Sequence, residues 1–317
     1  MNPFEYISAK SADTAVAADG RFLAGGIDLL GEMKEYIAQP KRLVNVKGLP
    51  GTREIVRGKE KWTLGANVTI AELEHDEQLK KTFPALHQAA AEVGSPQIRN
   101  VATVAGNLAQ HSRCWYYRHR DIHCLKKGGA TCYAREGENK YHSLFSGNPC
   151  ISPVVSNLAV ALAALDARVI VRRGKEDTTL TIPELYTKAW DNPQAHHSLG
   201  PADLILRVEI PDAGQKSAYM QISEKASFDW ALVSCAAAGK VAGGKLSQVR
   251  IVLGAVSPVP HQVTGANELL EGKKLDDDLA SKAAELVLKD ATPFAHNGYK
   301  VPIAHALLRR TLNQLVA

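Results

Sequence analysis

The stretch that decides the fold is residues 23–34, LAGGIDLLGEMK, in which a short apolar run ends at two glycines and leads into a helical pattern. Glycine lets backbone N–H groups approach an anion closely, and the start of a helix favours negative charge. Asp28 stands at the expected N-cap of that helix. We therefore predict a phosphate-binding turn here, although an ordinary strand-to-helix turn is the commoner meaning of such a motif.

A second turn of the same character follows at residues 103–110, TVAGNLAQ. Thr103 offers a hydroxyl, Gly106 offers bare backbone and Asn107 offers an amide that can donate and accept. Glycine and asparagine punctuate the surrounding stretch 94–110, so we expect turns there and no clear helix. Neither turn matches G-x-G-x-x-G, and the P-loop motif is absent from the chain, so neither a Rossmann nor a Walker A site is predicted.

Four of the five cysteines, Cys114, Cys124, Cys132 and Cys150, lie in one segment, whereas Cys235 stands alone in ALVSCAAAG. We expect Cys235 to be an inert thiol in a buried strand. The chain shows no export signal and is too long to need disulfides, so the cluster is a metal site, a redox pair or a set of unrelated thiols. Its gaps of 9, 7 and 17 residues contain no zinc knuckle. An iron–sulfur cube accepts long loops between its ligands.

The surroundings of the clustered cysteines contain both imidazoles and cations. Imidazole suits zinc, whereas cations offset the net negative charge of a cube with four thiolates. The same cations would suit a zinc tetrathiolate, so zinc stays open and the residues alone favour a [4Fe–4S] cluster only slightly. Two turns that can bind an anion, in a domain that also carries a redox cluster, indicate a dinucleotide cofactor with a pyrophosphate. The histidines are His111, His119, His123 and His142, and the cations are Arg113, Arg118, Arg120, Lys126, Lys127 and Arg135.

Length and composition describe an ordinary globular protein. The 317 residues are 45% apolar, 22% charged and 6% aromatic, with a net charge of +5. These values suggest two or three domains and exclude a disordered chain, a fibrous repeat and a coiled coil. No basic block interleaves with aromatic residues, so nucleic acid is not an expected partner. The chain has no apolar run of ~18 residues and no secretory pattern, so we expect a cytoplasmic protein without a membrane span.

The predicted elements give an α+β protein in two parts. Strands are expected at 42–46, 62–68, 167–173 and 204–211, with helices at 84–93 and 157–165. The best linker is DAGQKS at 212–217. Beyond it, three strands and three helices predict a C-terminal α+β module of about one hundred residues.

Five motifs follow one another along the chain: LAGGIDLLGEMK at 23–34, TVAGNLAQ at 103–110, NLAVALAALDA at 157–167, LILRVEIP at 204–211 and FDWALVS at 228–234. In this order they resemble the FAD-binding medium subunits of molybdenum hydroxylases, such as xanthine dehydrogenase, carbon monoxide dehydrogenase and aldehyde oxidoreductase. The resemblance covers nearly the whole chain. It implies a two-subdomain, vanillyl-alcohol-oxidase-like (PCMH-type) FAD-binding domain at 1–213 and a CO-dehydrogenase-flavoprotein-like α+β domain at 214–317.

The resemblance also implies that the two glycine turns bind the pyrophosphate region of FAD and that Ile205 lies near the flavin. Asn157 stands where the family often has Asp, which keeps an acceptor but loses a charge. Gln221 stands where a basic residue is common. The implied cofactor residues are Ala24, Gly25, Gly26, Ile27, Asp28, Leu29, Thr103, Gly106, Asn107, Asn157, Ile205 and Gln221.

Residues at about 111–151, here called the cysteine segment, resemble the inserted loop of a minority of the family. In aldehyde oxidoreductase of the periplasmic type and in hydroxybenzoyl-CoA reductase, four cysteines of this loop bind one [4Fe–4S] cluster. The resemblance therefore implies that Cys114, Cys124, Cys132 and Cys150 are cluster ligands, and it leaves zinc as the lesser alternative. If the segment is a separate module, Cys124→Ser should remove iron and leave flavin.

The function that the resemblance implies is electron transfer. A large molybdopterin subunit would act on the substrate, and a small [2Fe–2S] subunit would exchange electrons with FAD here, which serves an external acceptor. No residue is predicted to be catalytic, and co-export with a partner would place the complex in the periplasm. Alternatives are a hydroxybenzoyl-CoA-reductase-like subunit with reversed electron flow, an independent flavin oxidoreductase whose base is one of the four histidines, and a zinc-stabilised scaffold without redox activity.

Overall fold

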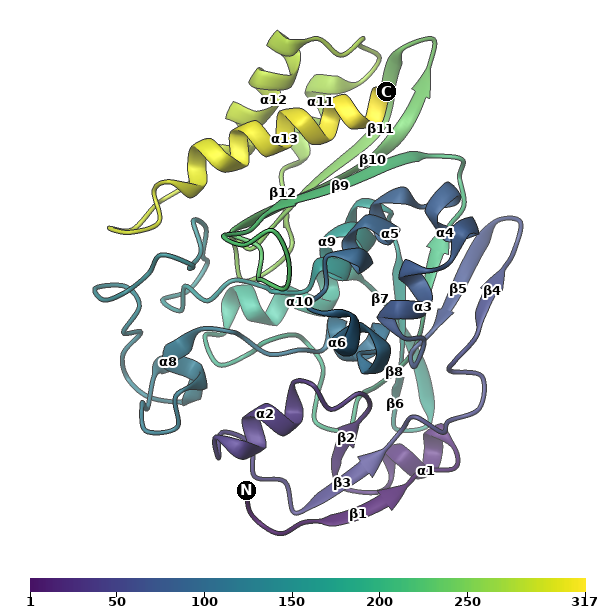
Figure 1. The fold of residues 1–317 in the computed structure, drawn as a ribbon, viewed down its shortest axis with the longest axis vertical. Helices are drawn as coiled ribbons and strands as arrows, with labels where there is room; N and C mark the ends of the chain where they lie inside the picture. Colours follow the sequence, from purple (N-terminus) through teal and green to yellow (C-terminus); the bar gives the residue numbers. More distant parts are fainter.

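The computed structural model describes residues 1–317 as three β-sheets with helices packed between and around them (Figure 1). Helices and strands are mixed along the chain, which confirms the predicted α+β class. In Figure 1 the C-terminal helices lie at the upper end of the molecule and the N-terminal sheet lies at the lower end. A membrane-spanning segment would need a long apolar helix, and the structure contains none.

The N-terminal sheet is small and parallel, with strand order β1-β3-β2. Its core includes Val44 from β3 and Leu204 from the start of β8, so the sheet packs against the rest of the molecule through that strand. The connections run through two short helices. The elements are β1 (Glu5–Ser8), α1 (Ala12–Val16), β2 (Arg21–Leu23), α2 (Leu29–Lys34) and β3 (Arg42–Asn45).

The central sheet has five antiparallel strands in the order β4-β5-β8-β6-β7. Its strands are β4 (Ile55–Arg57), β5 (Lys61–Gly65), β6 (Arg168–Arg173), β7 (Glu176–Thr181) and β8 (Leu204–Pro211). The helices of this part are α3 (Ile70–Glu74), α4 (Glu77–Thr82), α5 (Pro84–Ala91), α6 (Pro96–Val101), α7 (Val104–Leu108), α9 (Asn157–Ala164) and α10 (Ile182–Asp191).

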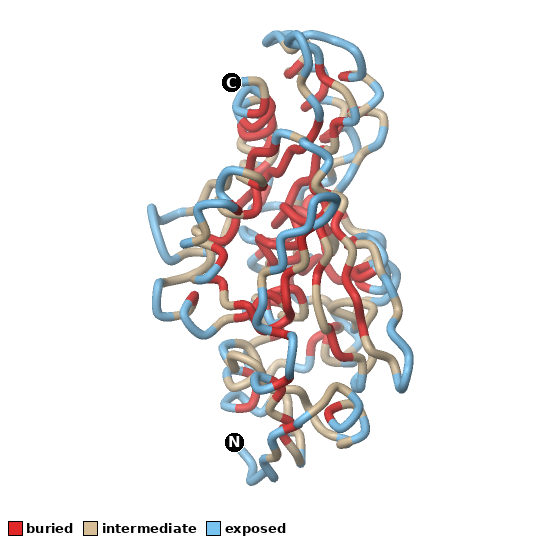
Figure 2. Tube along the Cα trace, turned by 90° about the vertical axis from the view of Figure 1, so that its right-hand side faces the viewer, coloured by how far each residue is buried: buried red, intermediate tan, exposed pale blue.

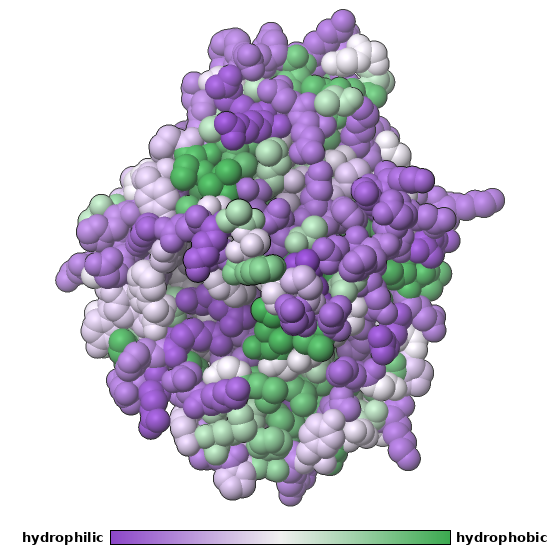
Figure 3. All heavy atoms as spheres, viewed as in Figure 1, coloured by the Kyte–Doolittle hydropathy of each residue, from purple (hydrophilic) through white to green (hydrophobic).

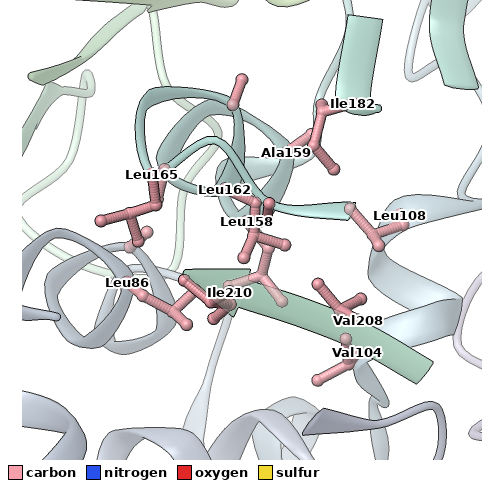
Figure 4. Close-up of a cluster of buried hydrophobic side chains, with 14 of the residues drawn as sticks. Leu86, Val104, Leu108, Leu158, Ala159, Leu162, Leu165, Ile182, Val208 and Ile210 are labelled. Atoms are coloured by element: carbon pink, nitrogen blue, oxygen red, sulfur yellow. The ribbon is translucent and has the colours of Figure 1, made fainter. Parts of the chain in front are cut away.

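Helix α9 lies at the centre of the largest core, and all eight of its residues are buried. It is apolar on every side because it packs against α5, α7 and α10 and also against β10 and β11. Figure 4 shows Leu158 and Leu162 of α9 among side chains of β8 and α5, including Ile210 and Leu86. The predicted helices at 84–93 and 157–165 are thus confirmed.

The C-terminal sheet is antiparallel, in the order β12-β11-β10-β9, and is buried on both faces. Cys235 and Ala237 of β10 face α12 and α13, whereas Ala236 and Ala238 face the central core. This explains why the strand is a continuous apolar run, and Cys235 is fully buried as predicted. The elements are β9 (Lys216–Ile222), β10 (Val233–Ala242), β11 (Lys245–Gly254), β12 (His261–Gln262), α11 (Thr264–Leu270), α12 (Asp277–Leu288) and α13 (Lys300–Val316). Figure 2 shows buried backbone running from these helices into the centre.

The prediction that residues 94–110 form no helix is wrong. The chain forms α6 and α7 there, each begun by a side chain that accepts a backbone N–H: Ser95 from Ile98 and Thr103 from Gly106. Ser95 followed by Pro96 is an N-cap followed by proline in the first turn, a signal that outweighs the glycines and asparagines.

The cysteine segment contains little regular structure. It forms the short helix α8 (Trp115–Arg118) and the 3-10 turn η1 (Leu125–Lys127), and turns and loops make up the rest. In Figure 1 it projects at the left edge of the molecule, level with the centre. The same face in Figure 3 is mostly hydrophilic, with apolar residues in separate groups.

Candidate functional site

A pocket with a volume of about 340 Å³ opens between the first glycine turn, α7 and the start of β8. This size is typical of small-molecule sites. Every predicted cofactor residue lines it except Gln221, which accepts a 3.1 Å hydrogen bond from Asn157 Nδ2 and so lies directly behind the wall. The lining residues from the prediction are Ala24, Gly25, Gly26, Ile27, Asp28, Leu29, Thr103, Gly106, Asn107, Asn157 and Ile205. Their contact with a cofactor stays a prediction.

The first glycine turn requires its glycines. A Cβ added to Gly25 would lie 2.1 Å from the carbonyl oxygen of Val101, which ends α6. Gly26 has φ of +74°, in the left-handed region that other residues adopt at a cost. Only glycine therefore lets the turn pack against the backbone between α6 and α7, and this packing brings the two predicted turns into one pocket.

The two turns differ in what their backbone can donate. None of the N–H groups from Ala24 to Asp28 donates a hydrogen bond within the chain. In the second turn, by contrast, Val104 donates to the carbonyl of Val68, and Gly106 donates to Thr103 Oγ at 3.1 Å. The N–H of Gly106 is therefore already bonded within the chain, whereas the predicted contact of Gly106 with a cofactor stays a prediction. Consecutive backbone N–H groups that make no hydrogen bond within the chain are well suited to bind phosphate oxygens.

The polar side chains at the back of the pocket are tied to neighbouring helices. The hydroxyl of Ser156, the N-cap of α9, donates to Asn107 Oδ1 at 2.6 Å. Asn107 and Asn157 are both more than nine-tenths buried. These contacts fix the orientation of the two amides and leave the Asn107 amide nitrogen without a partner in the chain.

Asp28 occupies the N-cap position of α2 but does not cap it. Its carboxylate instead accepts hydrogen bonds from Arg118 Nη2 at 2.5 Å and from the backbone N–H of His111 at 2.7 Å, and Arg113 Nη1 lies 2.8 Å away. The predicted capping role is wrong because the cysteine segment supplies stronger, charged donors. Asp28, Glu32 and His111 would also be spaced for a metal ion, but the two arginines already neutralise Asp28.

Glu32, one turn further along α2, is almost fully buried. It accepts hydrogen bonds from Tyr117 Oη at 2.6 Å and from His111 Nδ1 at 2.9 Å. Burial alone would raise the pKa of Glu32, but the hydrogen bond and charge of His111, the Tyr117 hydroxyl and Arg118 outweigh it and lower the pKa to about 2. Burial and the neighbouring Glu32 carboxylate raise the pKa of Tyr117. A carboxylate and a neutral phenol therefore meet at this contact.

The four clustered cysteines line one small cavity of about 10 Å³, and none forms a disulfide. No three of their sulfurs lie within 4.8 Å of one another. A zinc ion with four Zn–S bonds of ~2.3 Å would hold its sulfurs about 3.8 Å apart, so the four side chains would have to move together to bind it. A cube keeps its thiolates farther apart because four iron atoms lie between them. The cavity has about the volume of one water molecule, so the surrounding side chains would have to move apart to hold a cube.

Charge at this cavity is set by burial and by one lysine. Burial raises the pKa of Cys114 to about 11, and the hydrogen bond between Cys132 and Cys150 raises the pKa of Cys150 and lowers that of Cys132. Burial lowers the pKa of Lys126, while all four thiols act to raise it. The Nζ of Lys126 donates to the carbonyl of Ala195 at 2.8 Å. A buried cation beside four thiols suits an anionic metal centre.

The four candidate histidines separate into two pairs. His119 and His123 are exposed, whereas His111 lines the pocket and His142 lines the cysteine cavity. His142 Nε2 lies 3.1 Å from Cys114 Sγ, and burial lowers the pKa of His142 to about 4. His111 is engaged by Glu32 and stacks on the ring of His196 at 4.0 Å.

Sequence reasoning gave no role to several side chains of the site. Glu32 and Tyr117 meet across 85 residues of chain, and no local pattern signals such a pair. Trp230 and Phe228 stand exposed at the rim of the pocket, and Arg113 lies over the Trp230 ring at 4.8 Å. The FDWALVS motif leads into β10, but nothing in its sequence shows whether its aromatic residues lie at the rim of a pocket or in the protein core.

Comparison with known proteins decides the family. Residues 2–213 match the model of the FAD binding domain in molybdopterin dehydrogenase, and residues 217–315 match that of the CO dehydrogenase flavoprotein C-terminal domain. The chain belongs to the FAD-binding subunits of the molybdenum hydroxylases. This FAD-binding subunit is therefore part of a flavin-containing oxidoreductase family, as its motifs predicted.

Similar proteins span the whole length of this FAD-binding subunit. It is 31% identical to the aldehyde oxidoreductase FAD-binding subunit PaoB of Escherichia coli K12, over 100% of this chain and 98% of that protein. It is 23% identical to the carbon monoxide dehydrogenase medium chain of Hydrogenophaga pseudoflava, over 98% and 96%. The crystal structure of quinoline 2-oxidoreductase from Pseudomonas putida 86 has a TM-score of 0.77, with 22% identity and coverage of 99% and 97%. Reconstituted CO dehydrogenase from Oligotropha carboxidovorans has a TM-score of 0.78, with 23% identity and coverage of 100% and 99%. The structural similarities confirm the fold.

Proposed function

We propose that this subunit binds FAD in the pocket and one [4Fe–4S] cluster on Cys114, Cys124, Cys132 and Cys150. Bound FAD would supply two-electron exchange with an external acceptor, and the cluster would supply one-electron exchange. The chain's own residues hold these groups and control solvent access, and none acts as an acid or base on substrate. We place the FAD-binding domain at 1–213 and the C-terminal domain at 214–317.

The backbone N–H groups of the first glycine turn, which make no hydrogen bond within the chain, support the proposal that FAD binds in the pocket. Ala24 to Asp28 line the pocket and their N–H groups make no hydrogen bond within the chain, while Gly25 lets the turn pack closely against Val101. The Asn107 amide nitrogen offers a further donor at the back of the wall. Asp28 would oppose a pyrophosphate by charge, but Arg113 and Arg118 neutralise it.

The observation that carries the cluster is that all four thiols of the cysteine segment line one cavity beside Lys126. The gaps between them contain no zinc knuckle, which argues against the zinc-stabilised scaffold. Similarity to an aldehyde oxidoreductase subunit favours electron flow out of the substrate over the reversed flow of a hydroxybenzoyl-CoA-reductase-like enzyme. We also propose a large molybdopterin subunit and a small [2Fe–2S] subunit as partners, because several relatives are described as medium chains or subunits.

Electron paramagnetic resonance of dithionite-reduced protein, prepared without air, tests the cluster. The native chain should give the signal of a reduced [4Fe–4S] cluster, and Cys124→Ala should lose it. Cys235→Ala is the matched control, because Cys235 is buried in β10 away from the cavity, and it should keep the signal. A native chain without a cluster signal, or equal signals in both variants, would contradict the proposal.

A further inference from the structure

We propose that the two cofactor sites bind cooperatively, and that Tyr117 is the positioning residue that couples the cysteine cavity to the FAD pocket through Glu32. This inference rests on the proposed function, since it needs both cofactors to bind. It replaces the expectation of a separate cysteine module, in which iron could be removed without effect on flavin.

The contacts join the cysteine segment to α2 at two successive turns. Tyr117 Oη donates to Glu32 Oε1 at 2.6 Å, and Arg118 Nη2 donates to Asp28 Oδ1 at 2.5 Å. Arg113 adds a second ion pair to Asp28. Because the first glycine turn leads directly into α2, these bonds hold one wall of the pocket against the cysteine segment.

The two ends of this link belong to different cavities. Tyr117 lines the cysteine cavity and does not line the pocket, whereas Glu32 and Asp28 line the pocket. Cys114 is the N-cap of α8, and its carbonyl accepts the backbone N–H of Arg118. A cluster bonded to Cys114 would therefore fix the first residue of the helix that carries both Tyr117 and Arg118.

The cooperativity follows from the small size of α8. A helix of four residues is not stable by itself, so its order depends on what holds its ends. With the cluster bound, Tyr117 and Arg118 are held in position to bond Glu32 and Asp28 of the α2 region. FAD then binds to a pocket whose wall is already ordered. Without the cluster, FAD must also order α8, which lowers its affinity, and linkage requires FAD to strengthen iron binding by the same factor.

The experiment is an anaerobic FAD titration of the deflavinated full chain, followed by flavin fluorescence, with iron present and after removal by a chelator. Iron loss should weaken FAD binding roughly tenfold in the native chain, a typical coupling between sites. Tyr117→Phe removes only the hydroxyl and should reduce this factor to about threefold or less, because a hydrogen bond to a buried carboxylate is lost. Equal FAD affinity with and without iron in the native chain would overturn the proposal.

Tyr116→Phe is the matched control. Tyr116 lines the same cavity, but its hydroxyl accepts the backbone N–H of Glu138 at 2.8 Å and forms no hydrogen bond with α2. In this variant, iron loss should weaken FAD binding as much as it does in the native chain. If Tyr116→Phe and Tyr117→Phe reduce this effect equally, the proposal is also overturned. Iron retention against the chelator, with and without FAD, measures the same coupling from the other side. A native chain that binds no iron or no FAD would instead refute the proposed function.

Discussion

At the scale of single residues, Gly25 has the least freedom to change. An alanine Cβ there would meet the Val101 carbonyl oxygen at 2.1 Å, so the turn and the end of α6 would have to move apart. We expect Gly25→Ala to lower the free energy of unfolding by about 1–3 kcal/mol and to abolish FAD binding. Chemical denaturation and FAD titration measure the two effects.

Gly31 provides the comparison for that substitution. It lies in α2, and a Cβ added there would meet no atom within 4 Å. Gly31→Ala should retain FAD and should stabilise the helix by up to about 1 kcal/mol, since alanine favours helix. A Gly25→Ala protein that binds FAD as well as Gly31→Ala does would show that the turn does not need a bare backbone.

Glu32 makes the stability of the protein depend on pH. Its folded-state pKa of about 2 lies below the ordinary value of 4.5, so the unfolded chain binds more protons between these values. The stabilisation is complete above pH ~4.5 and is lost as the pH falls through ~2, with a size of roughly 3 kcal/mol. Glu32→Gln removes the ionisable carboxyl. The difference in free energy of unfolding between the native chain and this variant should therefore become smaller as the pH falls from ~4.5 to ~2.

The exposed Glu35, which is the C-cap of the same helix, is the control for Glu32. Glu35→Gln should change the free energy of unfolding little, because the side chain is exposed and makes no hydrogen bond or ion pair. Urea unfolding of the three proteins at a series of pH values supplies the comparison. A gap for Glu32→Gln that stays constant from neutral pH to pH 2 would contradict this account of the buried carboxylate.

At the scale of elements, α13 is anchored to the cysteine segment through Lys300. This lysine is fully buried, and its Nζ donates to the carbonyls of His142 at 3.0 Å and Ala255 at 2.9 Å. Lys300→Met keeps the apolar stem but leaves the Ala255 carbonyl unpaired and the His142 carbonyl with Asn297 Nδ2 alone, so the free energy of unfolding should fall by about 1–3 kcal/mol. Lys289→Met, at the exposed end of α12, should cost little. Equal thermal denaturation curves for the two variants would contradict the anchoring role.

The elements differ in how far the sequence alone predicts them. Helix α9 and strand β10 are evident, because uninterrupted apolar runs of their lengths must be buried on all sides. Helices α6 and α7 are missed, because glycine and asparagine suggest turns while the decisive signals are single capping residues, Ser95 and Thr103. The gathering of the predicted residues around one pocket follows from motif order. The contact between Glu32 and Tyr117 does not, because it depends on tertiary packing of a segment without periodicity.

At the scale of the whole molecule, the proposed function gives this subunit two cofactor sites and leaves the substrate chemistry to its partners. Native purification from the source cell should yield a complex with a large molybdopterin-containing subunit and a small [2Fe–2S] subunit, identified by mass spectrometry and molybdenum analysis. A chain that purifies alone under conditions that preserve its cofactors would contradict the proposed assembly.

The most direct test of the central claim is the stoichiometry of iron, acid-labile sulfide, zinc and FAD in the full chain prepared without air. We expect one FAD with about four iron and about four sulfide per chain, the composition of a single cube, and no zinc. A natively folded chain that contains one zinc and no iron, or that contains neither iron nor FAD, would contradict the account.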